Sequence, residues 1–290
     1  MILVGEDDDF TREVAAVANA KLVPVELHSF ADGEVRPRIE GVQFLKGEDV
    51  ALILRKDLNE NANSYLLNFL LLGDVIRKSG CKRLTGVMPY LVYARQDKVF
   101  RDGEPGSLDY LASVLEKTFD YIITISSHFQ REDGLIKRFP FRAFNVDGFK
   151  ALKEKLPAKD LFFLAPDKGE VPRARELARE LRGEFDYLEK TRDRATGKTK
   201  IEEKPLKVEG KNVVITDDMV STGGTIALAV EHVKRFNPKS VTVAFVHGAF
   251  TPGAVEKLKA LNVQLLYTDT IRENNASVTI ALEIAKVLKT

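Results

Sequence analysis

The stretch VVITDDMVSTGGTI, Val213–Ile226, combines an apolar run, two carboxylates, a glycine-rich turn and the start of an amphipathic segment. We expect a strand at Val213–Thr216 and a helix from Gly224 onward. A strand that leads into a helix through such a turn is typical of α/β proteins with parallel sheets. Because ligands of open α/β sheets bind at the carboxyl ends of the strands, the stretch predicts a site as well as a fold class.

Outward from this stretch, short apolar runs alternate with amphipathic segments along the chain. The other expected strands are Ile2–Val4, Val23–Leu27, Val50–Leu54, Leu84–Met88, Tyr121–Ser126, Leu161–Ala165, Phe185–Leu188, Val241–Val246 and Val263–Tyr267. The other expected helices are Asp9–Ala20, Ala62–Lys78, Leu108–Lys117, Val171–Leu181, Gly253–Ala260 and Ser277–Leu288. Several strand runs are continuously apolar, as in parallel strands that are covered on both faces. The pattern therefore predicts an α/β fold with mainly parallel sheets flanked by helices.

The alternation weakens in RFPFRAFNVDGFK, Arg138–Lys150, and we place a domain boundary there. The chain has 290 residues, which fits two domains of about 150 residues each. Both halves have a similar rhythm of strands and helices. We therefore expect two related α/β domains, at residues 1–144 and 145–290.

Composition excludes several other classes of protein. Hydrophobic residues make up 44%, too many for a disordered chain, and a single cysteine excludes a disulfide scaffold or a cysteine-rich zinc site. The 44 basic and 43 acidic residues leave a net charge of +1, which argues against a nucleic-acid binder. The first residues lack the pattern of a signal peptide, and the apolar run Tyr65–Ile76 is too short to span a membrane. We expect a soluble cytoplasmic protein.

The residues after the expected strand at Val213–Thr216 indicate a phosphorylated sugar. Glycines let a phosphate approach the backbone, where N–H groups, hydroxyls and the helix dipole bind it. The residues in question are Ser221, Thr222, Gly223, Gly224 and Thr225. Asp217 and Asp218 would repel a phosphate but suit the vicinal hydroxyls of a ribose, so we expect a ribose 5-phosphate site. The alternative is an ordinary strand–turn–helix with a side-chain N-cap.

This stretch resembles the phosphoribosyl-diphosphate binding motif of type I phosphoribosyltransferases and of ribose-phosphate diphosphokinases. Four further segments resemble the diphosphokinases and occur in the family order: FADGEVRPRI (Phe30–Ile39), PYLVYARQDKVF (Pro89–Phe100), APDKGEVPRARELA (Ala165–Ala178) and HGAFTPGA (His247–Ala254). The chain thus looks like a diphosphokinase of the shorter archaeal kind. The resemblance implies two tandem type I phosphoribosyltransferase-like domains, an ATP-side domain at 1–144 and a ribose 5-phosphate-binding domain at 145–290.

The resemblance also implies a reaction and a set of ATP contacts. The family moves the β,γ-diphosphate of ATP onto O1 of ribose 5-phosphate with Mg²⁺, which gives AMP and phosphoribosyl diphosphate. The implied ATP-binding residues are Phe30, Asp32, Gly33, Glu34, Arg95, Gln96 and Asp97. The first four reach the ATP of a neighbouring subunit in the family, so a homo-oligomer of at least two copies is implied. The alternatives are a tight Asp-Gly turn and a surface Arg–Asp pair.

Metal binding is implied for His128 and Asp167. A hard carboxylate oxygen suits Mg²⁺. Ser126 stands where the family carries an acid, which lowers the negative charge near His128. The alternatives are a buried histidine and a helix N-cap formed by Asp167.

The polar segment EKTRDRATGKTKIEEK, Glu189–Lys204, lacks a core pattern. It is either a solvated loop or exposed hairpin, or a lid over an active site. By resemblance, Lys190 stabilises charge on the transferring phosphoryl group. Arg192 binds the ribose or the transferring phosphate.

Two other functions remain open at this level. One is a non-catalytic regulatory homologue, for which the missing acid at Ser126 is the main argument. The other is a phosphoribosyltransferase that acts on a base. The ATP-type segments in the first half of the chain argue against the second of these.

Overall fold

The computed structural model describes residues 1–99, 101–192, 199–202, 204–273 and 275–289, without the side chains of 190–192 and 199–200. The described chain divides into two compact units. The first contains 1–148, 270–273 and the residues from 279 onward, and the second contains 149–269 and the stretch from 274 to 278.

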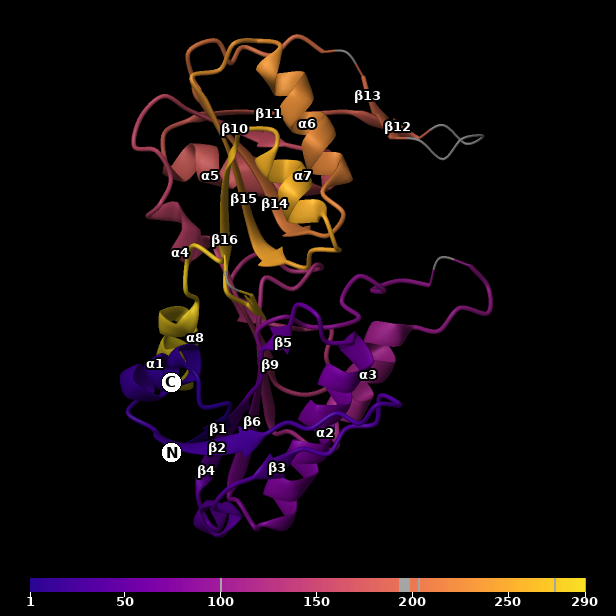
Figure 1. Ribbon diagram of the computed structural model, residues 1–290, viewed down its shortest axis with the longest axis vertical. Helices are drawn as coiled ribbons and strands as arrows, with labels where there is room; N and C mark the ends of the chain where they lie inside the picture. Colours follow the sequence, from indigo (N-terminus) through magenta and orange to yellow (C-terminus); the bar gives the residue numbers. More distant parts are fainter. Residues whose placement is uncertain (100, 193–198, 203, 274, 290) are drawn as a thin grey trace. The chain divides into compact units, whose positions relative to one another are not determined.

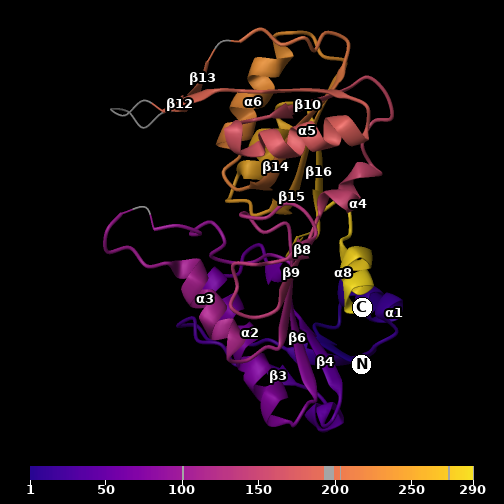
Figure 2. The same ribbon diagram turned by 180° about the vertical axis from the view of Figure 1, so that it is seen from behind.

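The first unit is built on a sheet in which six central strands run parallel and the edge strands are antiparallel to their neighbours. In spatial order the strands are β3 (Arg38–Ile39), β2 (Lys21–Glu26), β1 (Ile2–Gly5), β4 (Asp49–Ile53), β6 (Arg83–Met88), β7 (Tyr121–Ile125), β9 (Ala143–Val146) and β8 (Gly134–Leu135). The helices are α1 (Asp9–Ala18), α2 (Ala62–Lys78), α3 (Ser107–Glu116) and α8 (Ala281–Leu288), with a 3₁₀ turn at Val42–Leu45. Helices α2 and α3 cover one face of the sheet, and α1 and α8 cover the other (Figure 1; Figure 2).

Helix α2 shows why these residues fold as they do. Asn61 caps its amino end by accepting a hydrogen bond from the Asn63 N–H at 2.8 Å. One stripe of the helix is buried against the sheet, and it consists of Tyr65, Phe69, Leu72 and Ile76. Gly86 of β6 allows this close packing, because a Cβ there would lie only 2.8 Å from the Phe69 ring.

The second unit is built on a five-stranded sheet that is parallel throughout. In spatial order its strands are β11 (Glu184–Tyr187), β10 (Leu161–Ala165), β14 (Asn212–Val220), β15 (Ser240–Gly248) and β16 (Gln264–Thr268). The remaining elements are α4 (Phe149–Lys153), the 3₁₀ turn η2 (Lys168–Glu170), α5 (Val171–Glu180), α6 (Gly224–Lys234), α7 (Ala254–Lys259) and a hairpin of β12 (Lys190–Arg192) and β13 (Thr199–Ile201). Helix α5 lies on the opposite face of the sheet from α6 and α7 (Figure 1; Figure 2).

The predicted α/β class and its mainly parallel sheets are confirmed. Each of the ten expected strands and seven expected helices overlaps an observed element, with ends that differ by up to four residues. The short strands β3, β5 (Lys56–Asp57), β8, β9 and β17 (Ile271–Arg272) and the short helix α4 were not expected, whereas the hairpin of β12 and β13 was one of the alternatives for the polar segment Glu189–Lys204. Within the described ranges, none of the helices combines the length and the apolar character that crossing a membrane requires.

The two compact units differ from the expected division at 144/145 in two respects. That division falls inside β9, which pairs with β7 from Ile122↔Ala143 to Ile125↔Val146. The chain also returns to the first unit near its end. There β17 (Ile271–Arg272) pairs with β5 (Lys56–Asp57), and α8 packs against α1. The two expected domains, with their ATP and ribose 5-phosphate labels, remain predictions.

Candidate active site

Strand β14 carries the two adjacent carboxylates, and it is longer than the sequence indicates. The strand continues from Thr216 to Val220 because its partner β15 continues the ladder, with Asp217 opposite Phe245 and Met219 opposite His247. Asp217 and Asp218 therefore lie within the paired part of β14, near its end, rather than after the strand. Their positions are fixed by sheet hydrogen bonds, which makes them rigid acceptors at the carboxyl edge of the sheet.

The five residues Ser221–Thr225, here called the phosphate loop, join β14 to α6. Gly223 is the N-cap of α6 and has φ 66°, and no side chain caps the helix. The alternative of a side-chain N-cap is thus not realised at Gly223, but Gly224 N–H donates a hydrogen bond to Thr222 Oγ1 at 3.4 Å. The amino end of α6 therefore offers an anion its positive dipole and the N–H groups other than that of Gly224.

Three carboxylates gather at the edge of the sheet beside the phosphate loop. Asp217, Asp218 and Glu170 offer oxygens that all lie within 4.8 Å of one another, and Glu170 is only 5% exposed. Burial, together with the charges of Asp218 and Glu170, holds the pKa of Asp217 well above its ordinary value. The site thus concentrates negative charge that a cation or a hydroxyl-rich ligand would relieve.

Glu170 was missed as a site residue. The signal available was its place three residues after Asp167, close to the end of a predicted strand. Glu170 occupies the N-cap position of α5 but makes no cap hydrogen bond there. Its carboxylate lies instead beside those of β14.

Asp167 follows β10 and caps the 3₁₀ turn η2. Its Oδ1 accepts a hydrogen bond from the Gly169 N–H at 2.9 Å. The cap proposed as an alternative therefore exists, but at the 3₁₀ turn rather than at α5. The charge of Asp167 also contributes to the raised pKa of Asp217, so this carboxylate belongs to the same acidic region.

His128 lies in an exposed turn after β7, in the first unit, so it is not a buried histidine. Before it, Ser126 has a left-handed φ of 36°, a conformation that is uncommon for a residue with a side chain. Ser126 Oγ accepts a hydrogen bond from the Gly148 N–H at 2.9 Å, and Ser127 Oγ donates to Asn145 Oδ1 at 2.8 Å. Ser126 and Ser127 thus fasten β7 to β9 and its continuation.

The expected ATP element Phe30–Glu34 forms a closed turn between Ser29 and Val35, which are joined by an antiparallel bridge. Its internal hydrogen bonds are Phe30 N–H to Glu34 O at 2.8 Å, Gly33 N–H to Phe30 O at 3.0 Å and Glu34 N–H to Asp32 Oδ1 at 3.1 Å. The Asp-Gly turn is therefore real, and Gly33 has the φ of 94° that it requires. The Phe30 ring stays 42% exposed, with Arg36 5.5 Å from its centre.

The second ATP element, Arg95–Asp97, follows the turn after β6. Arg95 and Gln96 are exposed and Asp97 is half-buried. The pKa of Arg138 is raised mainly by its hydrogen bond with Asp109, and the charge of Asp97 adds to this effect. In the described part of the first unit, no hydrogen bond, ion pair or ring contact joins this element to Phe30–Glu34. The structure of one chain therefore does not bring the two elements into contact.

Lys190 and Arg192 lie on β12 of the β12–β13 hairpin, where Lys190 pairs with Ile201 and Arg192 with Thr199. The exposed-hairpin alternative for the polar segment is thus realised in the backbone. Their side chains and residues 193–198 lie outside the described part of the chain. The roles expected for Lys190 and Arg192 remain predictions.

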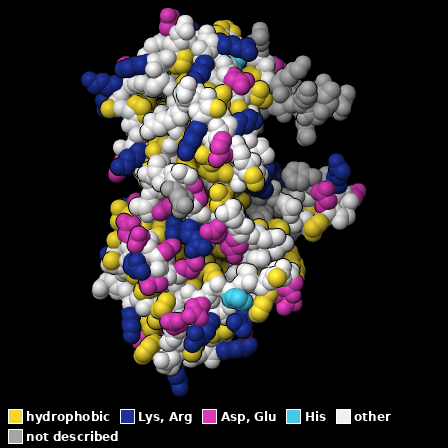
Figure 3. Space-filling view, viewed as in Figure 1, with side chains coloured by type: hydrophobic (Ala, Val, Ile, Leu, Met, Phe, Trp, Pro, Cys, Tyr) yellow, Lys and Arg dark blue, Asp and Glu magenta, His cyan; other side chains and the backbone are white. Residues whose placement is uncertain are grey.

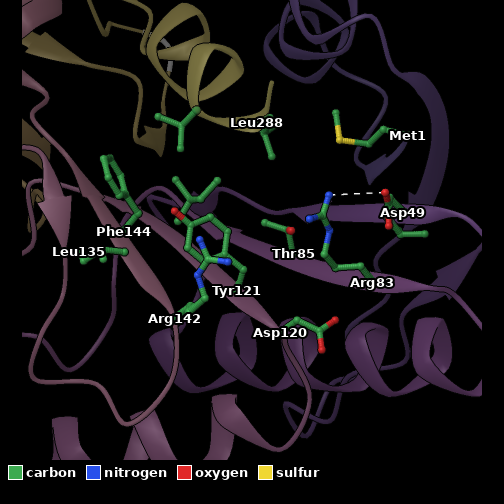
Figure 4. A pocket seen from close by; sticks show the side chains of 13 residues that line it. Met1, Asp49, Arg83, Thr85, Asp120, Tyr121, Leu135, Arg142, Phe144 and Leu288 are labelled. Carbon is green, nitrogen blue, oxygen red and sulfur yellow. Dashed lines mark hydrogen bonds and ion pairs between the residues drawn. The ribbon is translucent and has the colours of Figure 1, made fainter. Parts of the chain in front are cut away.

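A cavity of about 500 Å³ lies in the first unit, at the amino ends of its strands. In Figure 4, Arg83 points toward Asp49 across it, with Nη2 3.5 Å from Oδ2, and Arg142 lies near the Tyr121 ring. None of the predicted site residues lines it. It lies at the strand ends opposite to those where ligands of parallel sheets bind, and we assign it no part in the reaction.

The distribution of charged side chains on the surface is in keeping with the net charge of +1. On the face drawn in Figure 3, basic and acidic side chains are interspersed and do not gather into one basic patch. In the described part of the second unit, most lysines near carboxylates are paired with them, for example Lys153 with Glu180 at 2.5 Å and Lys211 with Glu184 at 2.6 Å.

Two family models match the chain. The model of the phosphoribosyl transferase domain matches residues 148–276, and that of the N-terminal domain of ribose phosphate pyrophosphokinase matches residues 1–118. With the parallel sheets and the phosphate loop, these matches define a protein of the phosphoribosyltransferase fold class.

Whole-chain relatives narrow this class to one family. A ribose-phosphate pyrophosphokinase of Saccharolobus solfataricus is 33% identical, over 96% of both chains, and one of Thermococcus kodakarensis is 32% identical, over 99% of this chain and all of the relative. The crystal structure of a phosphoribosylpyrophosphate synthetase from Mycobacterium smegmatis superposes with a TM-score of 0.84 at 25% identity, covering 99% of this chain and 97% of that one. The chain belongs to the ribose-phosphate pyrophosphokinase family, also called the diphosphokinases, and the predicted family and enzyme class are confirmed.

Proposed function

We propose that this chain carries out the reaction of its family as a ribose-phosphate diphosphokinase. It transfers the diphosphoryl group of ATP to O1 of ribose 5-phosphate and releases AMP and phosphoribosyl diphosphate. The observation that carries the proposal is the uncapped amino end of α6 beside the carboxylates of β14, in a chain whose relatives match over its whole length. The loop offers N–H and hydroxyl groups that donate hydrogen bonds to a phosphate, and the carboxylates of β14 accept hydrogen bonds from two neighbouring hydroxyls. Ribose 5-phosphate carries both kinds of group, whereas a phosphate ion carries only the first.

Ribose 5-phosphate binds with its phosphate on the phosphate loop and its ribose toward Asp217 and Asp218. The phosphate accepts hydrogen bonds from the N–H groups at the start of α6 and from the hydroxyls of Ser221, Thr222 and Thr225. The carboxylates accept hydrogen bonds from the ribose hydroxyls. Glu170, whose oxygens lie within 4.8 Å of theirs, keeps this end of the site acidic. The geometry orients the sugar in one direction, because a reversed sugar would place phosphate against carboxylates.

ATP binds to the elements at Phe30–Glu34 and Arg95–Asp97. Arg95 offers a planar guanidinium for phosphate or for stacking on the base, and Gln96 hydrogen-bonds adenine. The exposed Phe30 ring supplies a flat apolar surface for adenine. Because the element at Phe30–Glu34 resembles one that reaches the ATP of a neighbouring subunit in the family, we expect a homo-oligomer of at least two copies, in which each element comes from a different chain.

Mg²⁺ is the expected cofactor, with His128 and Asp167 as its protein ligands. Asp167 fits Mg²⁺, because carboxylate oxygens are the ligands that this ion prefers and Asp167 lies in an acidic region of the second unit. The choice of His128, whose imidazole is a less usual ligand for Mg²⁺, follows from the family resemblance alone. Bound Mg²⁺ supplies neutralisation of charge on the phosphate oxygens. Lys190 stabilises the charge that develops on the transferring phosphoryl group, and Arg192 binds the ribose or the same group. We expect the enzyme to work in the cytoplasm on these small molecules, without a nucleic acid or membrane partner.

One coupled assay tests this proposal. Purified protein is incubated with ATP and Mg²⁺, with and without ribose 5-phosphate, and AMP and phosphoribosyl diphosphate are measured. We expect AMP only when ribose 5-phosphate is present, in equal amounts with the second product. Absence of both products would indicate a non-catalytic homologue. Consumption of added phosphoribosyl diphosphate by a free base would indicate a phosphoribosyltransferase.

A further inference from the structure

The segment that follows β15 packs directly on the phosphate loop. Thr251 donates its backbone N–H to the carbonyl of Ser221 at 3.2 Å. Leu258 of α7 lies against Gly223, where an added Cβ would be 3.2 Å from its Cγ. Figure 1 shows α7 beside α6 on the same face of the sheet. The segment HGAFTPGA and helix α7 therefore support the phosphate loop. The sequence of the segment alone did not predict this role.

This packing brings one cation to the amino end of α6. Lys257 of α7 extends its ammonium toward Gly224, the first residue of α6, and Nζ lies 3.9 Å from the position of a Cβ on that glycine. The side chain is exposed. Within the described ranges Lys257 has no ion pair, whereas Lys168 and Lys204 of the same unit each contact a carboxylate. Lys257 thus offers a full positive charge that the protein itself does not neutralise.

A phosphate monoester needs such a charge at this place. It carries about −1.5 to −2 at neutral pH, whereas the end of a helix supplies only about +0.5. The carboxylates of Asp217, Asp218 and Glu170 gather at the same sheet edge and add negative charge to the site. The N–H groups of the loop therefore fix where the phosphate lies, but they do not balance its charge.

We propose that Lys257 binds the 5-phosphate of ribose 5-phosphate through its ammonium group. It thereby selects the phosphorylated sugar over free ribose. This inference rests on the proposed function, because it assigns the loop to that substrate. Lys257 is a substrate-binding residue that acts through charge, at the end of the sugar remote from O1. Its removal should weaken ground-state and transition-state binding alike.

Three variants test the assignment. Lys257→Met removes the charge but keeps an apolar stem, Lys257→Arg keeps the charge, and Lys259→Met removes a charge from another exposed position on the same short helix. Steady-state rates are measured against ribose 5-phosphate and against ATP, and binding of ribose 5-phosphate alone is measured by calorimetry.

We expect Lys257→Met to raise the KM for ribose 5-phosphate and its dissociation constant about 10- to 100-fold, with kcat and the KM for ATP unchanged. Lys257→Arg should restore most of the loss, and Lys259→Met should behave as wild type. Equal ribose 5-phosphate affinity in Lys257→Met and Lys259→Met would overturn the assignment. Because calorimetry needs no turnover, it decides the role of Lys257 even if wild-type protein makes no product, a result that would instead reject the proposed function.

Discussion

Strand β14 in the second unit and β7 in the first both end at the carboxyl edge of a parallel sheet and lead into polar residues. After β14, the N-cap Gly223 leaves α6 without a side-chain cap, and of the helix-start N–H groups that of Gly224 donates to Thr222 Oγ1. After β7, Ser126 and Ser127 are hydrogen-bonded to Gly148 and Asn145, and their polar groups are used within the protein. The difference teaches that two polar strand ends of similar sequence character can use their polar groups in different ways, one toward its own helix start and the other toward a neighbouring strand.

The two strand ends also differ in how they are held in place. The carboxyl end of β14, here called the open end, is held by ladder pairs up to Val220↔Gly248 and by the hydrogen bond from Thr251 to Ser221. Its groups are thus already ordered before a ligand binds. The closed end at β7 holds its turn in a left-handed conformation at Ser126 and presents only the exposed His128. The first end is suited to bind a substrate, and the second to position a single side chain.

The largest effect on turnover is expected from a residue outside both strand ends. Neither strand end supplies a cation for the diphosphoryl group that is transferred from ATP. Lys190→Ala on β12 should lower kcat about 10²- to 10³-fold, since it removes charge stabilisation in the transition state. ATP binding should remain measurable by calorimetry. The neighbouring variant Thr191→Ala serves as control. Turnover that does not change in Lys190→Ala would remove this residue from the catalytic role.

The closed strand end should respond in stability. Asn145 is fully buried, accepts two hydrogen bonds from Ser127 and donates one to the Glu132 carbonyl at 2.9 Å. Asn145→Ala should lower the free energy of unfolding by about 2–3 kcal/mol, because buried polar groups lose their partners. Urea unfolding measures this. The KM for ribose 5-phosphate should not change, and a change in KM without loss of stability would break the comparison.

The open strand end should respond in substrate binding. Gly223→Ala places a Cβ on a left-handed residue and against Leu258, at a cost of about 1–2 kcal/mol. Because the strain distorts the start of α6, the KM for ribose 5-phosphate should rise about 10-fold. Gly210→Ala is the matched control, since Gly210 has a similar φ of 69° with nothing within 4 Å of its Cβ. If both variants raised KM equally, the effect would not arise at the loop.

The smallest effect concerns pH. The pKa of Asp217 lies well above its ordinary value of 3.8 in the folded state. Between these two values the unfolded chain ionises first, so stability falls as pH rises, by up to about 1.4 kcal/mol per pH unit. Asp217→Asn should remove this loss: without ligand, the variant should match wild type near pH 3 and unfold at higher urea above pH 5. Parallel curves at all pH values would contradict the raised pKa.

Local sequence was enough to predict the parallel sheets and the phosphate loop, because each depends on neighbouring residues. Leu161–Ala165 is continuously apolar, and the glycines at 223 and 224 directly follow a strand. Strand β9 was missed, since its run AFNV is short and contains a buried asparagine whose partners lie on another strand.

The missed site residues required tertiary information. Glu170 reaches the carboxylates of β14 only because η2 folds back at the end of β10. Lys257 is 33 residues beyond Gly224, and only the packing of α7 brings its ammonium to that residue. The motif Val213–Ile226 is continuous in the sequence, so it predicts the backbone N–H groups of the loop after β14. The acid Glu170 and the proposed phosphate-binding Lys257 come from segments that lie far from the motif in the sequence.

The return of the chain to its first unit has a consequence for how the protein is made. Arg272 forms ion pairs with Glu6 at 2.5 Å and with Asp57 at 3.1 Å, and α8 packs against α1. These contacts join residues that are far apart in the sequence: Glu6 and Arg272 are 266 positions apart. The second unit, whose strands are nearly continuous in sequence, can therefore fold while the first still lacks its closing helix. Until α8 is made, the face of α1 against which it packs stays uncovered.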